Sequence, residues 1–104
     1  MVAFPALRLR RLREGEPLRA LIRETKLSAT DLIYPIFVTH GRDLREPVAP
    51  MPGIYHLSLD LLLAEVTEVA DLGIPGILLF GLPAHKDPLG SEAYDEHGII
   101  QEAI

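Results

Sequence analysis

Residues 75–104 read PGILLFG (75–81), LPAHKDPLGSEAYDEHG (82–98) and IIQEAI (99–104). The first segment is apolar and predicts a strand, while the last begins an apolar pattern at helical spacing. The polar segment between them is seventeen residues long, and loops of that length are more often functional than filler. Because no capping signal follows Ile99, Ile100 and Ala103, the sequence predicts that the chain ends inside a helix and is a fragment.

The composition is that of an ordinary globular protein, with 48% hydrophobic and 24% charged residues. A length of 104 residues allows one domain at most. The absence of cysteine excludes disulfides and thiolate metal sites from this segment. No apolar run approaches the roughly 18 residues needed to cross a bilayer, and the arginine-rich start lacks the apolar core of a secretory signal. We therefore expect a cytoplasmic protein with no membrane partner.

The net charge of −5 is unevenly distributed along the chain. Residues 1–26 carry seven basic and three acidic side chains, a net charge of +4, which leaves −9 for the remainder. A basic arm can bind nucleic acid, but no aromatic platform or recognition motif accompanies this one, so no nucleic-acid partner is expected. A solvated arm, or an arm that lies on an acidic neighbouring subunit, explains the charge as well.

The first third of the chain predicts an arm followed by a strand. Residues 1–15 mix apolar residues with arginines and have no room for a core, so we expect them to be extended or held by a partner. Glu16 to Lys26 predicts a short helix, because Pro17 suits a first turn and apolar residues recur at helical spacing. Residues 32–39, LIYPIFVT, predict a strand buried on both faces. Pro35 then requires an edge, a bulge or a missing bond directed away from a neighbour.

The middle of the chain predicts an irregular connection and a longer helix. Prolines and a glycine within residues 41–55 indicate a loop or a short irregular hairpin. Ser58 is expected to cap a helix by accepting an early backbone N–H, Asp60 complements the helix dipole, and Gly73 ends the helix. The next strand spans residues 75–81, so the two strands must pair in parallel through a right-handed crossover. The apolar stripe of this helix consists of Leu59, Leu62, Val66, Val69 and Ala70.

A strand-helix-strand unit followed by another helix occurs in doubly wound sheets and in (β/α)8 barrels. Neither of the phosphate-binding fingerprints of nucleotide folds follows a strand, which favours the barrel. The predicted fold class is therefore α/β, the opening part of a (β/α)8 TIM barrel. We expect an N-terminal arm and short helix over residues 1–28 and the first βαβ portion over residues 29–104. Barrel chemistry lies at the carboxyl ends of the strands, here residues 38–41 and the loop that begins after Phe80.

Four segments together resemble porphobilinogen synthase, also called δ-aminolevulinic acid dehydratase. They are DLIYPIFV (31–38), REPVAPMPGIYHLSLD (45–60), ADLGIPGILLFGLP (70–83) and KDPLGSEAYDEHGIIQEAI (86–104), of which KDPLGSEAYD is distinctive. The resemblance begins at about Arg10 and covers only about the first third of the family's length. It implies an enzyme that condenses two molecules of 5-aminolevulinate into porphobilinogen for tetrapyrrole (haem) biosynthesis. It also implies a homo-oligomer in which the N-terminal arm wraps a neighbouring subunit.

The resemblance places the family's two Schiff-base lysines on later barrel strands and its metal ligands outside this segment. We therefore expect no catalytic residue, metal ligand or cofactor here, although a divalent metal (zinc or magnesium) is implied for the complete enzyme. The lysines present are Lys26 and Lys86. Lys86 beside Asp87 on an exposed loop should stay charged, so a surface or loop-ordering role is expected rather than nucleophilic attack. Residues 1–104 alone are predicted to be inactive.

Phe80 is the candidate substrate-binding residue. It matches a family phenylalanine in the apolar wall of the substrate pocket, and ordinary packing of a barrel interior would explain it equally well. The loop acids and histidines match no metal-ligand template and are expected to be solvated, with Asp95 capping the helix that begins near Gly98. These loop side chains are His85, Asp87, Glu92, Asp95, Glu96 and His97. Ser91 and Tyr94 are expected to pack the loop, and His40 and His56 are expected to be structural or exposed.

Two alternatives remain open. One is a non-catalytic oligomerisation or assembly module derived from the same family, and the other is a barrel enzyme of different chemistry that shares this opening. In either case two strands cannot close a barrel, so both would present unpaired edges and a hydrophobic face. Alone, the chain is expected to associate or aggregate.

Overall fold

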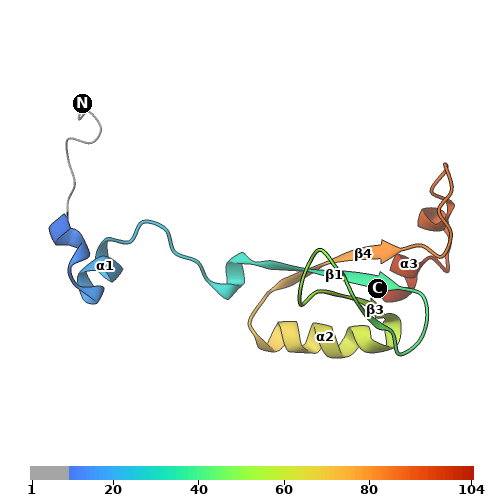
Figure 1. Ribbon diagram of the computed structural model, residues 1–104, viewed down its shortest axis with the longest axis horizontal. Coiled ribbons are helices and arrows are strands. Elements are labelled where there is room, and N and C mark those ends of the chain that lie inside the picture. Colours follow the sequence, from blue (N-terminus) through green and yellow to red (C-terminus); the bar gives the residue numbers. More distant parts are fainter. Residues whose placement is uncertain (1–9) are drawn as a thin grey trace.

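The computed structural model describes residues 10–104 as a small mixed sheet with helices and an extended N-terminal segment (Figure 1). Residues 1–9, which belong to the predicted arm, lie outside this description. The helices are α1 (Glu16–Ile22), α2 (Leu59–Asp71) and α3 (Ile99–Ala103), with 3-10 turns at Arg10–Arg13, Ala29–Asp31 and Ser91–Tyr94. The strands are β1 (Ile33–Thr39), β2 (Arg45–Pro47), β3 (Tyr55–Ser58) and β4 (Gly76–Leu82).

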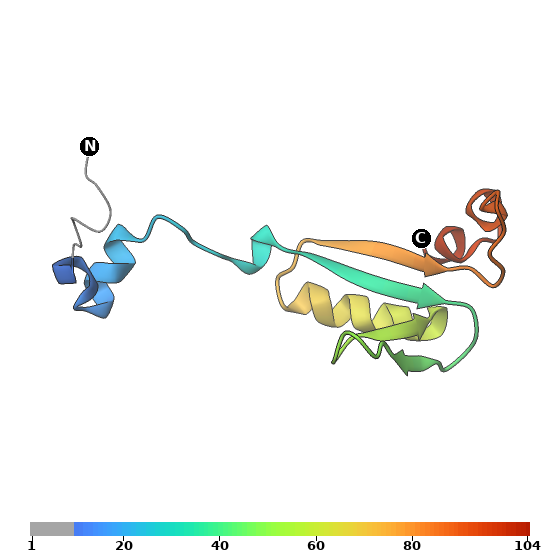
Figure 2. The same cartoon turned by 45° about the horizontal axis from the view of Figure 1, so that its top comes forward.

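The four strands form one sheet in the order β2-β3-β1-β4. β1 pairs in parallel with β4 along its whole length, from Ile33 opposite Gly76 to Thr39 opposite Leu82. β3 is also parallel to β1, whereas β2 is antiparallel to β3. The arrowheads of β1, β3 and β4 accordingly point the same way in Figure 2. The predicted parallel pairing of the two long strands is confirmed, and their carboxyl ends share one edge of the sheet.

The irregular connection predicted for residues 41–55 is a short hairpin made by β2 and β3. β3 itself was not predicted, because four residues between a proline-rich turn and a helix are too short to show strand alternation. Its presence corrects the expectation that both long strands would have open edges. β1 lies in the interior of the sheet, and β4 is an edge strand of the described chain.

Pro35 is accommodated because β3 reaches only the second half of β1. Pro35 lies opposite Leu78 of β4, while pairing with β3 begins at Phe37. On the side of β3 the strand is therefore locally an edge at Pro35. Proline occurs at such positions because it has no N–H to contribute to a second ladder.

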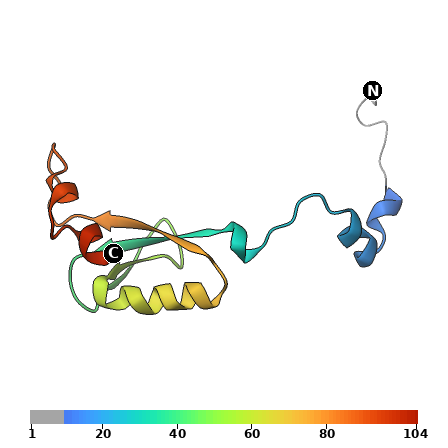
Figure 3. The same cartoon turned by 180° about the vertical axis from the view of Figure 1, so that it is seen from behind.

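One face of the sheet is covered by α2 and α3, and the core lies there. α2 runs along the strands on this face (Figures 1 and 3). Val38 is completely buried, and burial of each such apolar side chain contributes about 1.5–3 kcal/mol. The core side chains are Ile36 and Val38 of β1, Leu57 of β3, Leu62 of α2 and Ile99 of α3.

The opposite face of the sheet is largely exposed. Strand alternation places Ile33, Leu78 and Phe80 on this face, and they are 68%, 50% and 45% exposed. The prediction that residues 32–39 are buried on both faces is thus wrong for the described chain, because α2 and α3 pack against the same side. In a closed barrel this open face would line the interior.

α2 begins and ends where the sequence predicts, but its cap differs. Gly73 adopts a left-handed conformation (φ 84°) directly after the helix, as a C-terminal glycine should. Ser58 precedes the helix but makes no side-chain bond to it. Its Oγ instead accepts the Leu44 N–H at 2.9 Å, and its own N–H donates to the Leu44 carbonyl at 3.1 Å. Within the predicted stripe, Leu62 and Val69 are buried, Leu59 and Val66 are half-buried and Ala70 is exposed.

The N-terminal segment extends away from the sheet. α1 and the turn before it lie far from the strands in Figures 1 and 2, and the radius of gyration of 21.6 Å exceeds the roughly 13 Å of a compact chain of this length. α1 ends at Ile22, so the predicted extension to Lys26 is wrong. Leu21 is 82% exposed, and a short helix that packs against the neighbouring 3-10 turn rather than the sheet gains little from propagation.

Replacing Ser58 with alanine tests the bond between β3 and the loop before β2. The half-buried Leu44 N–H would lose the buried Ser58 hydroxyl as its acceptor, so we expect the free energy of unfolding to fall by about 1–2 kcal/mol. Urea denaturation followed by circular dichroism measures this change. Thr67→Ala is the control, because the exposed Thr67 hydroxyl only donates back to the Leu63 carbonyl and its loss should cost under about 0.5 kcal/mol. Equal losses of stability in the two variants would contradict a stabilising role for the hydrogen bond between Ser58 and Leu44.

Candidate functional site

The candidate site lies at the shared carboxyl edge of β1 and β4. His40 directly follows β1, and the loop 82–98 follows β4. This loop lies beyond the arrowheads of both strands in Figure 1, and α3 returns beside the strand ends. The predicted site regions, residues 38–41 and the loop after Phe80, are therefore brought together.

An aromatic pair occupies the open face just before this edge. The rings of Phe37 and Phe80 are stacked, with centroids 5.3 Å apart and planes inclined by 22°. His56 of β3 lies edge-on to Phe37 at 5.9 Å. Phe80, the predicted substrate-binding residue, thus belongs to an apolar wall on the face away from the helices.

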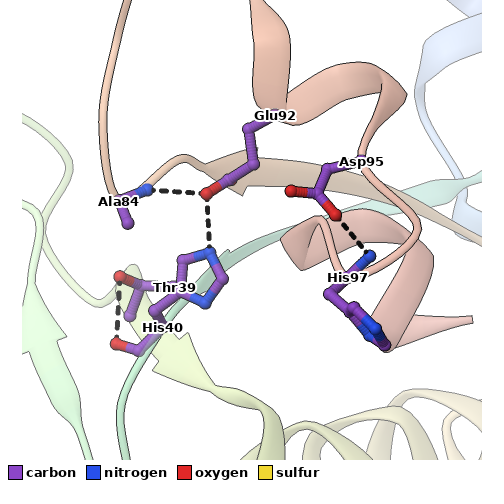
Figure 4. A network of polar contacts seen from close by, with 6 residues as sticks. All are labelled: Thr39, His40, Ala84, Glu92, Asp95 and His97. Atoms are coloured by element: carbon purple, nitrogen blue, oxygen red, sulfur yellow. Dashed lines mark hydrogen bonds and ion pairs between the residues drawn. The ribbon is translucent and has the colours of Figure 1, made fainter.

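Glu92 connects the loop to the end of β1 (Figure 4). Its Oε1 accepts the Ala84 N–H at 3.0 Å and lies 2.9 Å from His40 Nε2. The Glu92 side chain is only 19% exposed, so solvent screens these contacts less than it screens a surface ion pair. The hydrogen bond from the Ala84 N–H, together with His40, lowers the pKa of Glu92.

The long loop is folded by its own side chains. Asp87 Oδ1 accepts the N–H groups of Leu89 at 3.1 Å and Ser91 at 2.9 Å. Hydrogen bonding from Ser91 lowers the pKa of Asp87. The Tyr94 hydroxyl donates to the Leu89 carbonyl at 2.7 Å, which agrees with the loop-packing role predicted for Tyr94. These contacts order the loop from within.

The junction between the loop and α3 depends on Gly98. Gly98 is buried and is the N-cap of α3, and a Cβ there would collide with the Glu92 and Asp95 carbonyl oxygens. Asp95 does not cap α3 as predicted. Its Oδ1 accepts the His97 N–H at 2.9 Å, because the backbone turn at 95–98 keeps this carboxylate ahead of the helix.

A separate cavity of about 530 Å³ lies between the loop and α3. Its walls include Gly81, which strand alternation places on the helix-covered face, together with Ile99 and Ile100 of α3. Lys86 also lines this cavity and forms no ion pair within residues 10–104. Lys86 thus borders a space next to α3, whereas the Phe80 ring lies on the open face of the sheet.

Within the part of the chain that the structure describes, no three histidine or acidic side chains gather in a group that could hold a metal ion. The other histidine–carboxylate pair of this region, His97 with Glu102 at 3.1 Å, is largely exposed. None of the helices over residues 10–104 is long and apolar enough to cross a membrane.

The family model for delta-aminolevulinic acid dehydratase matches residues 6–104. The chain belongs to this family. A delta-aminolevulinic acid dehydratase of Halalkalibacterium halodurans is 59% identical over 97 residues, covering 93% of this chain and 30% of the relative. The corresponding protein of Bacillus subtilis is 47% identical with the same coverage. The chain thus spans about 30% of the length of the curated relatives it matches.

A solved structure of the family shares the fold of this chain. It is delta-aminolevulinic acid dehydratase (porphobilinogen synthase) from Toxoplasma gondii in complex with the reaction product porphobilinogen. The TM-score is 0.83 at 33% identity, over 93% of this chain and 28% of that one. The family resemblance carried by KDPLGSEAYD is confirmed, and the α/β architecture is that of the opening part of the barrel.

Sequence reasoning did not predict the pairing of His40 with Glu92. The topology alone brings the residue after β1 close to the loop after β4. That loop offers Asp87, Glu92, Asp95 and Glu96, however, and nothing in their order singles out one of them. The 3-10 turn at 91–94 decides the choice by directing Glu92 back toward the strand ends (Figure 4).

Gly81→Ala tests how closely α3 approaches β4. A Cβ at Gly81 would lie 2.6 Å from Ile99 Cγ2 and 2.8 Å from Ile100 Cγ1, so α3 must move and the free energy of unfolding should fall by about 1–3 kcal/mol. Gly76→Ala, on the same strand, is the control because its nearest neighbour would be 4.0 Å away. Thermal unfolding of both variants measures the difference. A Gly81→Ala protein as stable as Gly76→Ala would show that α3 does not rest there.

The lowered pKa of Glu92 predicts how the loop responds to acid. A carboxylate with a depressed pKa in the folded state stabilises that state above its ordinary pKa, and the contribution is lost as pH falls through the depressed value. We therefore expect the NMR shift of the Ala84 amide proton to titrate with a midpoint below the ordinary glutamate value of about 4.5. In His40→Ala the midpoint should rise toward that value. An unchanged midpoint would rule out His40 as a contributor.

Proposed function

We propose that this chain forms the N-terminal portion of a porphobilinogen synthase, which condenses two molecules of 5-aminolevulinate into porphobilinogen in tetrapyrrole biosynthesis. The observation that carries the proposal is the family match over residues 6–104. It is supported by the fold shared with the product complex from Toxoplasma gondii. The placement of the aromatic wall and the loop at the carboxyl edge of the parallel strands agrees with where barrel enzymes hold their substrates.

In this proposal Phe80 contributes to the apolar wall of the substrate pocket. It lies on the open face, near the carboxyl end of β4, and stacks on Phe37. A stacked pair of rings with one of them exposed offers flat apolar surface to the carbon chain of a small keto acid while its carboxylate is bound elsewhere. Barrel packing alone would bury the same ring against other interior side chains.

The amines that attack the substrate ketone come from outside residues 1–104. A lysine nucleophile needs an unprotonated amine, which burial provides. Lys86 is exposed and lines the cavity on the helix-covered side, and Lys26 is exposed in the extended segment after α1. Neither amine is placed to meet a substrate held against Phe80.

Three further properties of the family are proposed for the complete enzyme. These are a divalent metal (zinc or magnesium), a cytoplasmic location, and a homo-oligomer held by an arm and arm helix over residues 1–28, ahead of the barrel portion at 29–104. Residues 10–104 offer no group of side chains that could hold the metal, so its ligands are proposed to lie outside them. The extension of α1 away from the sheet supports an arm that packs on another subunit.

A chimera tests the proposal. Residues 1–104 would replace the matching segment of the Halalkalibacterium halodurans relative, which is 59% identical to this chain. We expect porphobilinogen to form from 5-aminolevulinate in the chimera, measured by its coloured adduct with an aldehyde reagent, and none to form with residues 1–104 alone. A folded but inactive chimera, or turnover by the isolated chain, would contradict the proposal.

Phe80→Ala in the same chimera tests the wall. Loss of a stacked ring should raise KM by about tenfold, since burial of a few carbon atoms of substrate is worth on the order of 1–2 kcal/mol. Phe80→Leu should restore part of this loss by restoring apolar surface. Leu63→Ala, which truncates an exposed side chain of α2 on the far side of the sheet, should leave KM unchanged.

The second candidate is a non-catalytic assembly module of the same family, which the extended N-terminal segment favours. Such a module would bind complete subunits without supplying a functional pocket wall. It predicts that residues 1–104 associate with the Halalkalibacterium halodurans relative during size-exclusion chromatography while the chimera stays inactive.

A further inference from the structure

One carboxylate joins the two long strands beyond their last paired residues. The β1–β4 ladder ends with Thr39 opposite Leu82. His40 is the next residue after β1, and Ala84 is the second residue after β4. Glu92 Oε1 contacts both, at 2.9 Å from His40 Nε2 and 3.0 Å from the Ala84 backbone nitrogen. Figure 4 shows the side chain reaching from the loop to meet both partners.

These contacts differ from the other loop contacts in what they connect. The bonds made by Asp87 and Asp95 join residues within four positions of one another. The contact of Glu92 with His40 spans 52 positions and links two separate strands. Beyond a strand end a backbone N–H has no ladder partner, so the charged acceptor that satisfies the Ala84 N–H also fixes the path of the chain leaving β4.

The contacts of Glu92 with His40 and Ala84 lie next to the aromatic wall formed by Phe37 and Phe80. Phe37 and Phe80 are paired in register only two positions before the end of the ladder. Between this pair and the strand ends, Gly81 has no side chain with which to hold β4 against β1. If the strand ends separate, the distance between the two rings changes with them, because each ring is carried by its own strand.

We propose that Glu92 is a positioning residue: it clamps the carboxyl ends of β1 and β4 through His40 and the Ala84 N–H, and so holds the Phe37–Phe80 wall in place for substrate. The inference rests on the proposed function, because a wall needs a substrate. The carboxylate does not touch substrate. It acts through β1 and β4, which carry the two rings. Its loss should therefore weaken substrate binding more than it slows turnover.

Kinetics of the Halalkalibacterium halodurans chimera test the role of Glu92. We expect Glu92→Ala to raise KM for 5-aminolevulinate about tenfold with kcat changed less than about twofold, since a lost charged hydrogen bond disorders the site without removing a reacting group. Glu92→Gln keeps an oxygen that accepts both N–H groups and should restore most of the affinity. An unchanged KM in Glu92→Ala, or a Glu92→Gln variant as impaired as Glu92→Ala, would overturn the proposal.

Glu102→Ala is the matched control. Glu102 also pairs with a histidine in this region, but its partner His97 is 84% exposed and belongs to the same segment of chain. An exposed pair of this kind contributes little, so KM should stay within about twofold of the parent chimera. A loss as large as that of Glu92→Ala would show that any change of charge near the loop has the same effect, and would overturn the clamp.

Hydrogen exchange of the 104-residue chain separates the clamp from the proposed function. At one fixed pH, Glu92→Ala should speed exchange of the Ala84 amide and leave α2 unchanged. Unaltered exchange at Ala84 would overturn the proposal that Glu92 holds the strand ends. Exchange that is accelerated as much in α2 as at Ala84 would show a general loss of stability and would overturn it as well. If the parent chimera makes no porphobilinogen, the proposed function fails while this measurement still decides whether Glu92 holds the strand ends.

Discussion

The parallel pairing of β1 with β4 is the constraint from which the rest of this chain follows. Seven residue pairs align the two strands along their whole length. Parallel neighbours cannot be joined by a tight turn, so the chain between them must cross the sheet, and it uses that crossover for the β2–β3 hairpin and for α2. The same pairing brings the carboxyl ends together and gives the loop 82–98 a place where it contacts both strands.

The two faces of the sheet have different roles because the helices cover only one of them. Ile36 and Val38 of β1 meet Leu62 of α2 and Ile99 of α3 on the covered side. The alternate residues of the same strands, among them Phe37 and Phe80, remain on the open side. A (β/α)8 barrel needs this division, with an outer layer of helices and an inner face lined by large side chains. The chain therefore has the layered plan of the barrel although it spans about 30% of the length of its relatives.

The sequence predicts the elements that have a periodic apolar pattern over many residues or a strong local signal such as a glycine that ends a helix. The strands at 32–39 and 75–81 and the helix between Ser58 and Gly73 are confirmed, because an apolar pattern extends over many residues in each and Gly73 ends the helix. The sequence does not predict β3 because its four residues carry too little pattern, and the prediction that the Ser58 hydroxyl caps α2 is wrong. The latter error has a physical cause, since Leu44 reaches Ser58 only through the hairpin, which no local rule predicts.

The candidate site likewise contains one feature that the local sequence predicts and one contact that depends on residues far apart in the chain. The position of Phe80 near a strand end follows from the strand prediction. The contact of Glu92 with His40 depends on a 3-10 turn within a loop and on the register of two strands, so the sequence indicates the neighbourhood but not the partners. A polar contact between residues 52 positions apart carries no periodic signal, and only the assembled backbone determines it.

The open face of the sheet also bears on how such a chain is made. Synthesis proceeds from the N-terminus, so β1, α2 and β4 leave the ribosome before the residues that follow them in the chain. At that moment Ile33, Leu78 and Phe80 form an apolar strip in contact with water. Apolar surface that is exposed in this way is prone to aggregation until other residues cover it. Phe80, the residue proposed to contact substrate, belongs to this strip, so a surface suited to binding is also one that can mispair until it is covered.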